Sequence, residues 1–284
     1  MLFQAFLLSW VPGLFWLLYV ESRAPRRSSL WRIALTFLAG GLSVSLVFAF
    51  HHLLDQAGWG MLGQVPTTPL AAAGYFVVLV GLLEESCKLL ACALVCLPRA
   101  DFRESWDGVC CASSVALGFA TVENFKYVVE TGQPTVLIGR FLLSTFAHVV
   151  MSGLWGYALG WWRSGSLRSM GVILGALGWA AFLHGVYDWF LWVGLWPGAL
   201  LVYAGLITLF RHRLQESYFA SQQRWHSSEQ VRECQQCRGL SRAEYNCCSQ
   251  CGGRELSEAR VCLACLAPCQ SQQEQCTQCS RTFL

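Results

Sequence analysis

Ionisable side chains recur inside the hydrophobic segments of this chain, about one group to a segment. In chain order they are Glu84, Glu85 and Lys88, then Glu123, then His148, and finally His184 with Asp188. An ionisable group in a bilayer costs several kcal/mol unless it faces another such group or water. Carboxylates and imidazoles that lie together can activate a water molecule or hold a metal ion. The pattern therefore predicts one buried site of the kind that an intramembrane enzyme needs.

The helical spacing inside these groups suggests how they would cooperate. Glu84 and Glu85 lie about 100° apart on a helix, and Lys88 falls between them one turn later. A cation there would keep a carboxylate ionised, and an ionised, poorly solvated carboxylate beside a water molecule is a general base. His184 and Asp188 are four residues apart and share a helix face, so the aspartate can orient the imidazole.

Each group also has a plainer explanation when it is taken alone. Glu84 and Lys88 can form a structural ion pair, His148 can be a hydrogen-bonded packing residue, and Glu123 can reach water near an interface. Seven such groups at one depth are harder to explain by packing. An ion-coupled transporter is the main rival, because carboxylate and histidine relays also lie midway through membranes.

The composition divides the chain into a membrane domain and a polar tail. Of 284 residues, 55% are hydrophobic and 13% are charged, whereas soluble domains carry about 25% charged residues. The hydrophobic character ends near Leu214, and ten of the fifteen cysteines follow it. We predict a transmembrane domain over 1–214, a linker or polar helix over 215–230, and a cysteine-rich module over 231–284.

The fold class predicted for the first part is an all-α polytopic membrane protein of about seven transmembrane helices. Met1–Val20 has no basic start and no cleavage site, so we interpret it as the first span and not as a signal peptide. The expected spans are Leu2–Val20, Leu30–Leu54, Leu70–Leu97, Gly108–Val129, Gly139–Trp162, Met170–Val193 and Trp196–Phe210.

Basic residues set the orientation of these spans. Lys and Arg occur in every second connection and are absent from the others. By the positive-inside rule the N-terminus lies outside and the tail lies in the cytosol. This orientation places all the ionisable groups in the outer half of the membrane. Two small-residue pairs, Gly156-x3-Gly160 and Gly171-x3-Gly175, are expected to let helices pack closely.

The tail contains a repeated four-cysteine unit. Each unit has two Cys-x2-Cys pairs, and the second unit follows the first by 28 residues. The predicted ligands are Cys234, Cys237, Cys248 and Cys251, then Cys262, Cys265, Cys276 and Cys279. This spacing is typical of a zinc ribbon, so we predict two structural zinc ions in a cytosolic double zinc ribbon. Cys247 is an alternative ligand to its neighbour Cys248.

The tail's partner is expected to be a protein. Four thiolates around each zinc make the module net acidic, which disfavours binding to nucleic acid. We therefore interpret it as a module that recruits a substrate, a regulator or another copy of the chain. A rigid cap that only protects the terminus is the alternative.

The ordered set of membrane motifs resembles the PrsW family of predicted intramembrane proteases. It comprises Glu84-Glu85-x2-Lys88, Phe119-x3-Glu123-Asn124, an isolated His148, and His184-x3-Asp188, over about residues 70–195. That family is similar to the wider CAAX-protease and bacteriocin-processing superfamily. CAAX proteases typically have histidine in place of Glu123 and asparagine in place of Asp188. The roles of the CAAX-protease residues therefore transfer less directly to these two positions than to the other residues of the set.

The resemblance implies hydrolysis of a peptide bond in or near the membrane, in a membrane-spanning protein or peptide. By analogy, Glu84 or Glu85 would activate water with help from Glu123 or His148, while His184 would stabilise the oxyanion and Asp188 would orient His184. Glu85, Glu123, His148 and His184 are the candidate ligands if a catalytic metal takes part. We favour a glutamate-activated water without an obligatory metal.

The expected location is the lipid bilayer, and a bacterial inner membrane fits the family. Two alternatives to a protease stay open. One is the transporter, and the other is a membrane scaffold without catalysis, in which the zinc ribbons carry the function.

Overall fold

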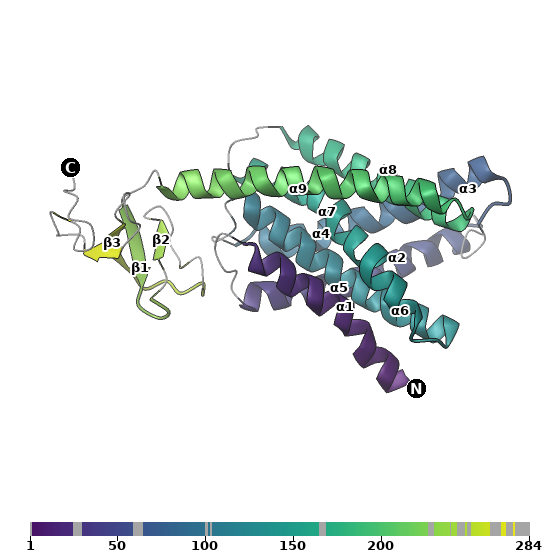
Figure 1. Ribbon diagram of the computed structural model, residues 1–284, viewed down its shortest axis with the longest axis horizontal. Coiled ribbons are helices and arrows are strands. Elements are labelled where there is room, and N and C mark those ends of the chain that lie inside the picture. Colours follow the sequence, from purple (N-terminus) through teal and green to yellow (C-terminus); the bar gives the residue numbers. More distant parts are fainter. Residues whose placement is uncertain are drawn as a thin grey trace.

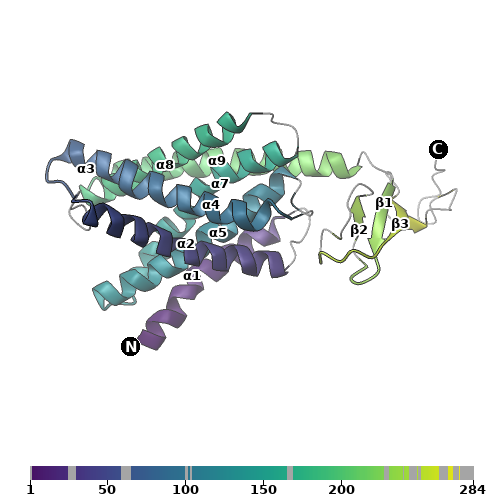
Figure 2. The same ribbon diagram turned by 180° about the vertical axis from the view of Figure 1, so that it is seen from behind.

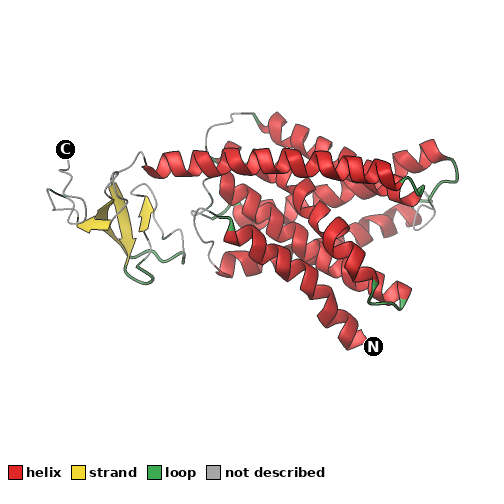
Figure 3. Cartoon of the chain, viewed as in Figure 1, coloured by secondary structure: helices red, strands yellow, loops and turns green. Residues whose placement is uncertain are grey.

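The computed structural model gives a helical bundle followed by a small sheet (Figures 1 and 3). It describes residues 2–24, 30–58, 65–99, 102, 104–164, 169–226, 230–238, 240–242, 248, 251–261, 268–270 and 275. The helices are α1 (Leu2–Ser22), α2 (Leu30–Gln56), α3 (Pro69–Tyr75), α4 (Leu83–Cys96), α5 (Ser105–Thr131), α6 (Val136–Gly139), α7 (Thr145–Arg163), α8 (Met170–Trp192) and α9 (Trp196–His226).

Five helices in the described part are long and apolar enough to cross a membrane. They are α1, α2, α5, the continuous helix Val136–Arg163, and α8. Large apolar side chains on their outer faces, such as Leu18, Leu42 and Leu174, are exposed, as expected where lipid surrounds a protein. The chain is thus an integral membrane protein. The other two predicted spans are also helical, and the count of seven stays a prediction.

Helix α5 lies at the centre of the bundle and packs against α1, α2 and α7. Close approach is possible because glycine hydrogens face backbone at each crossing. A Cβ built on Gly40 would lie 1.9 Å from the carbonyl oxygen of Val115, and one on Gly108 would lie 2.1 Å from that of Gly156. The prediction that Gly156 and Gly160 allow close packing is confirmed.

The second glycine pair, Gly171 and Gly175, does not lie at a close helix contact. A Cβ on Gly175 would meet no described atom within 4 Å, and one on Gly171 would meet only the Ser169 side chain. The prediction that this pair packs against another helix of the chain is therefore wrong within the described residues. The α8 face that carries it borders an open groove.

Two π-helical stretches interrupt the helices just before the ionisable groups. One, Phe76–Leu82, joins α3 to α4 and ends two residues before Glu84. The other, Arg140–Ser144, joins α6 to α7. Wide turns of this kind recur at functional sites because they shift the register of the side chains that follow.

The first π-helical stretch crosses α8 at a point where both helices have glycine. A Cβ on Gly81 would lie 2.1 Å from the carbonyl oxygen of Ala181, and one on Gly185 would lie 2.4 Å from Cα of Val77. The crossing places the start of α4 against the middle of α8. Figure 2 shows α4 from the other side of the bundle, where it packs on α2.

The tail forms a four-stranded antiparallel sheet beyond the end of α9 (Figure 1). Its strands are β1 (Gln230–Cys234), β2 (Leu240–Arg242), β3 (Leu256–Val261) and β4 (Pro268–Gln270), in the order β2-β1-β3-β4. Helix α9 runs without a break into the predicted linker and ends at His226. The sheet joins strands from both cysteine units, because β4 lies within the second.

Candidate functional site

Lys88 lies at the centre of a buried cluster of charged groups. Its Nζ is 3.2 Å from Glu84 Oε2, 2.9 Å from Glu85 Oε1 and 3.0 Å from His148 Nδ1. The ammonium group also lies 4.1 Å from the centre of the Phe119 ring, a cation–π distance. Lys88 is fully buried, so these contacts replace its hydration shell.

Glu85 is fully buried, and both of its oxygens are occupied. Oε1 accepts from Lys88 and lies 3.1 Å from His184 Nδ1. Oε2 accepts from Ser152 Oγ at 2.7 Å and from Trp155 Nε1 at 2.8 Å. A carboxylate held by four partners is a rigid anchor. It ties α4 to α7 and to α8.

Glu84 and Asp188 lie on the more open side of His184. His184 Nε2 is 3.4 Å from Asp188 Oδ2 and 3.8 Å from Glu84 Oε2. The side chains of Glu84 and Asp188 are 14% and 29% exposed, whereas that of His184 is 4% exposed. Water can therefore approach Glu84, while Glu85 behind it is sealed from solvent.

Glu123 completes the cluster from α5. Its Oε2 lies 2.8 Å from His148 Nε2 and 2.9 Å from a terminal nitrogen of Arg140. Arg140 Nε in turn donates to Asn124 Oδ1 at 2.7 Å, and Asn124 Nδ2 donates to Thr145 Oγ1 at 3.1 Å. A chain of polar contacts thus runs from the second π-helical stretch to the centre of the site.

The structure brings all seven candidate residues from the sequence into this one cluster. Sequence reasoning missed several side chains that bind this cluster, among them Arg140 and Trp155. An arginine inside a predicted span was a usable signal, because such a residue needs a buried partner. Trp155 follows His148 by seven residues and Ser152 by three, so it extends the stripe on α7 that those two residues form.

A metal ion fits the donor set at the open side of the cluster. Glu84, His148 and His184 each offer one ligand atom, and these atoms all lie within 4.8 Å of one another. Two imidazoles and one carboxylate form a common ligand set of catalytic zinc. This ligand set differs from the one expected from the sequence, which had Glu85 and Glu123 in place of Glu84. Glu85 and Glu123 instead bind other side chains.

The tail holds a second group of candidate metal ligands. The sulfur atoms of Cys234, Cys237, Cys248 and Cys251 lie within 4.8 Å of one another. The distance is 3.6 Å from Cys234 to Cys251 and 3.5 Å from Cys237 to Cys248. Tetrahedral zinc with bonds of about 2.3 Å separates its sulfurs by about 3.8 Å, so this arrangement suits a metal ion.

The second predicted set, Cys262, Cys265, Cys276 and Cys279, lies outside the described residues, as does Cys247.

Membrane-crossing helices around a buried cluster of carboxylates, histidines and a lysine define a polytopic membrane protein with an intramembrane site suited to hydrolysis. The family model described as PrsW family intramembrane metalloprotease matches residues 28–211. The chain belongs to this family.

Several proteins named Protease PrsW are similar to the chain. The one from Geobacillus kaustophilus is 31% identical over 155 residues, which cover 55% of this chain and 64% of that protein. The one from Bacillus subtilis is 35% identical over 112 residues, which cover 39% of this chain and 51% of that protein. The one from Clostridioides difficile is 27% identical over 228 residues, which cover 74% of this chain and 89% of that protein. The chain thus spans between half and two thirds of the length of the first two relatives. No solved structure matches it.

Proposed function

We propose that this chain is an intramembrane endopeptidase in which Glu84 activates the attacking water. The observation that supports this most directly is the difference between two neighbouring carboxylates. Glu85 is sealed and has four partners, whereas Glu84 is partly exposed and, among the described residues, its carboxylate lies near Lys88 and the edge of His184. A general base must have room for water beside it. The relatives named as proteases support the same reaction.

In the proposed reaction, Glu84 accepts a proton as the water oxygen bonds to the peptide carbonyl carbon. The Lys88 ammonium, 3.2 Å from Glu84 Oε2, favours the charged carboxylate that this step needs. His184 is held by Glu85 through Nδ1. Its Nε2–H turns from the 3.4 Å contact with Asp188 to donate a hydrogen bond to the developing oxyanion. Glu84 then gives the proton to the leaving nitrogen as the C–N bond breaks. Glu123 and His148 hold the far side of Lys88.

A catalytic metal is compatible with the same residues. Glu84, His148 and His184 would hold it, and when bound it would polarise the carbonyl and acidify the attacking water. Lys88 contacts two of these three side chains, so its positive charge opposes binding of a cation at that point. For this reason we favour the glutamate route as the main proposal.

The remaining parts of the proposal concern the arrangement of the chain. The membrane domain covers 1–214, α9 extends into the linker, and 231–284 form a double zinc ribbon with two zinc ions. The alternation of basic loops supports seven spans and a cytosolic tail. The similarity to bacterial proteins supports a bacterial inner membrane as the location. A reporter that fluoresces only in the cytosol, fused after Leu284, should therefore fluoresce.

The deciding experiment compares purified wild-type protein with Glu84→Gln in detergent. Both are incubated with single-span membrane peptides, and the products are identified by mass spectrometry. Wild type alone should cleave, at a bond in or near the membrane segment. Lys126→Gln, a change at an exposed surface ion pair, is the matched control and should cleave normally.

Equal cleavage by Glu84→Gln and wild type would exclude the proposed base. If folded wild type cleaves no peptide but carries an ion flux in vesicles, the transporter interpretation replaces the protease.

A further inference from the structure

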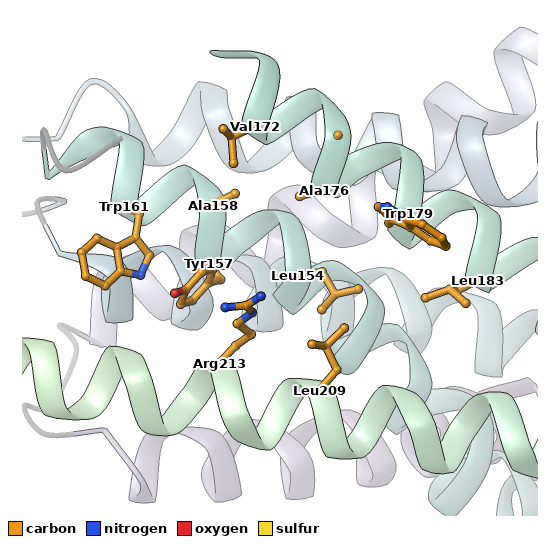
Figure 4. Close-up of a pocket in the computed structure, with 11 residues that line it drawn as sticks. Leu154, Tyr157, Ala158, Trp161, Val172, Ala176, Trp179, Leu183, Leu209 and Arg213 are labelled. Carbon is orange, nitrogen blue, oxygen red and sulfur yellow. The ribbon is translucent and has the colours of Figure 1, made fainter. Parts of the chain in front are cut away.

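A groove of about 910 Å³ lies between α7, α8 and α9, and none of the residues that line it belongs to the buried cluster. Figure 4 shows α7 between α8 and α9, with side chains from all three helices lining the space. Most of the lining is apolar, including Leu154, Val172, Trp179 and Leu183. This volume lies within the range of small-molecule pockets.

One end of the groove is polar, and it is the end nearest the tail. Arg213, Tyr157 and Trp161 line it (Figure 4). Among the residues that the structure describes, the indole nitrogen of Trp161 is buried without a hydrogen-bond partner. Arg213 donates to Glu216 at 2.8 Å through one terminal nitrogen. A guanidinium has five N–H donors, so Arg213 can hold Glu216 and a second anion together.

The length of the groove corresponds to one leaflet. Val172 and Leu183 mark its two ends along α8, eleven residues or about 16 Å apart, and half of the hydrocarbon core is about 15 Å. Beyond the groove α8 and α9 close together, because a Cβ on Gly198 would lie 2.9 Å from the Phe190 ring. A partner helix that crosses the whole bilayer would meet this closure.

We propose that the groove binds one anionic phospholipid of the leaflet on the tail side. The acyl chain lies along the apolar faces of α7 and α8, where Gly175 leaves room. The phosphate binds Arg213 and the Trp161 indole N–H. Arg163 adds positive charge at the same end of α7. Basic pockets between membrane helices bind anionic headgroups in this manner.

Native mass spectrometry of the full-length protein in detergent micelles tests the proposal, with phosphatidylglycerol and phosphatidylcholine as the added lipids. Wild type should bind one phosphatidylglycerol saturably and prefer it to phosphatidylcholine. Arg213→Gln should weaken phosphatidylglycerol binding about fivefold, the effect of one basic residue near an anionic headgroup. Arg211→Gln, two residues away and outside the lining, is its control.

The second pair of variants tests the acyl-chain site. Gly175→Leu fills the groove and should abolish the saturable lipid, whereas Gly178→Leu on the same helix should not. A Cβ at either position meets no described atom within 4 Å, so both proteins should fold. If both glycine variants bind lipid as wild type does, the proposal is wrong. If Gly175→Leu changes only self-association or cross-linking to a membrane peptide, the groove is a protein interface instead.

Discussion

Glu84 and Glu85 are adjacent in sequence, yet their side chains lie in different surroundings. Helical geometry turns them about 100° apart, so one faces the sealed interior and the other the open edge. Glu85 holds four partners on three helices. Glu84 has room for water. In the proposed reaction, Glu85 is therefore the anchor and Glu84 the base.

Replacing Glu85 with glutamine should destabilise the fold. Glutamine keeps one acceptor oxygen and places an NH₂ donor where a carboxylate oxygen now accepts. Breaking a buried ion pair typically costs 3–5 kcal/mol, so we expect the free energy of unfolding to fall by about 3 kcal/mol. Glu84→Gln should cost much less, because its side chain reaches solvent. Unfolding of both variants in mixed detergent micelles measures the difference. An equal loss of unfolding free energy in both variants would show that Glu85 does not stabilise the fold more than Glu84 does.

Arg140→Lys should slow catalysis without weakening substrate binding. Lysine keeps the charge but lacks the planar fork that joins Glu123 to Asn124. Changes at residues that orient a reacting group typically cost 10–100-fold in activity, so kcat should fall by about that factor with KM unchanged. Steady-state kinetics on one cleavable peptide decides this. A raised KM with normal kcat would place Arg140 in substrate binding.

Sequence reasoning identified the members of the site better than their roles. Ionisable residues in apolar segments must find partners, so His148 or Glu123 can be recognised one segment at a time. Which oxygen meets which donor depends on helix rotation and on π-helical turns, which the sequence does not reveal. The structure therefore moved the candidate metal ligand from Glu85 to Glu84.

At the scale of elements, the site depends on how closely two helices cross. The π-helical stretch before α4 meets α8 at Gly81 and Gly185, with backbone on both sides. This contact fixes the distance from Glu85 to His184. Glycine here is required for close approach and not for backbone conformation, since both residues lie within helices.

Gly185→Ala should consequently reduce activity strongly. Its new Cβ would lie 2.4 Å from Cα of Val77 and 2.5 Å from its backbone nitrogen, so the helices must separate. Near-attack geometry is sensitive to displacements of about 1 Å, which can cost about 100-fold. Gly178→Ala, seven residues earlier on α8 and open to space, is the control. Peptide cleavage rates and the yield of folded protein are the measurements. Normal cleavage by Gly185→Ala would mean that the crossing does not set the site geometry.

The helices themselves were largely predictable. Hydropathy located every long helix, because a membrane span must satisfy its own backbone hydrogen bonds. The helices that pack against α8 were not predictable. The spacing Gly171-x3-Gly175 is equally compatible with a helix-packing face and with the wall of a groove. The interruption at Phe76–Leu82 was not predictable either, because apart from Gly81 its residues are ordinary helix and strand formers.

At the scale of the whole molecule, two groups of candidate metal ligands are joined by α9, which leads from the membrane bundle to the sheet (Figure 1). Their chemistry differs. Four thiolates would close the tail site, so a metal ion there would stabilise the fold, whereas the membrane site offers two imidazoles and a carboxylate and would leave a position open. Metal content and activity should therefore respond separately to substitutions in the two places.

Metal analysis of the purified full-length protein should find two zinc ions for each chain. Cys234→Ser should remove one of them and make the tail sensitive to added protease, because zinc supplies most of the folding free energy of such small modules. Cys262→Ser should remove the other. His184→Ala should leave both in place while it abolishes cleavage, since the proposed base needs no metal. A third ion that disappears in His184→Ala would instead place a catalytic metal at Glu84, His148 and His184, and the glutamate route would have to be abandoned.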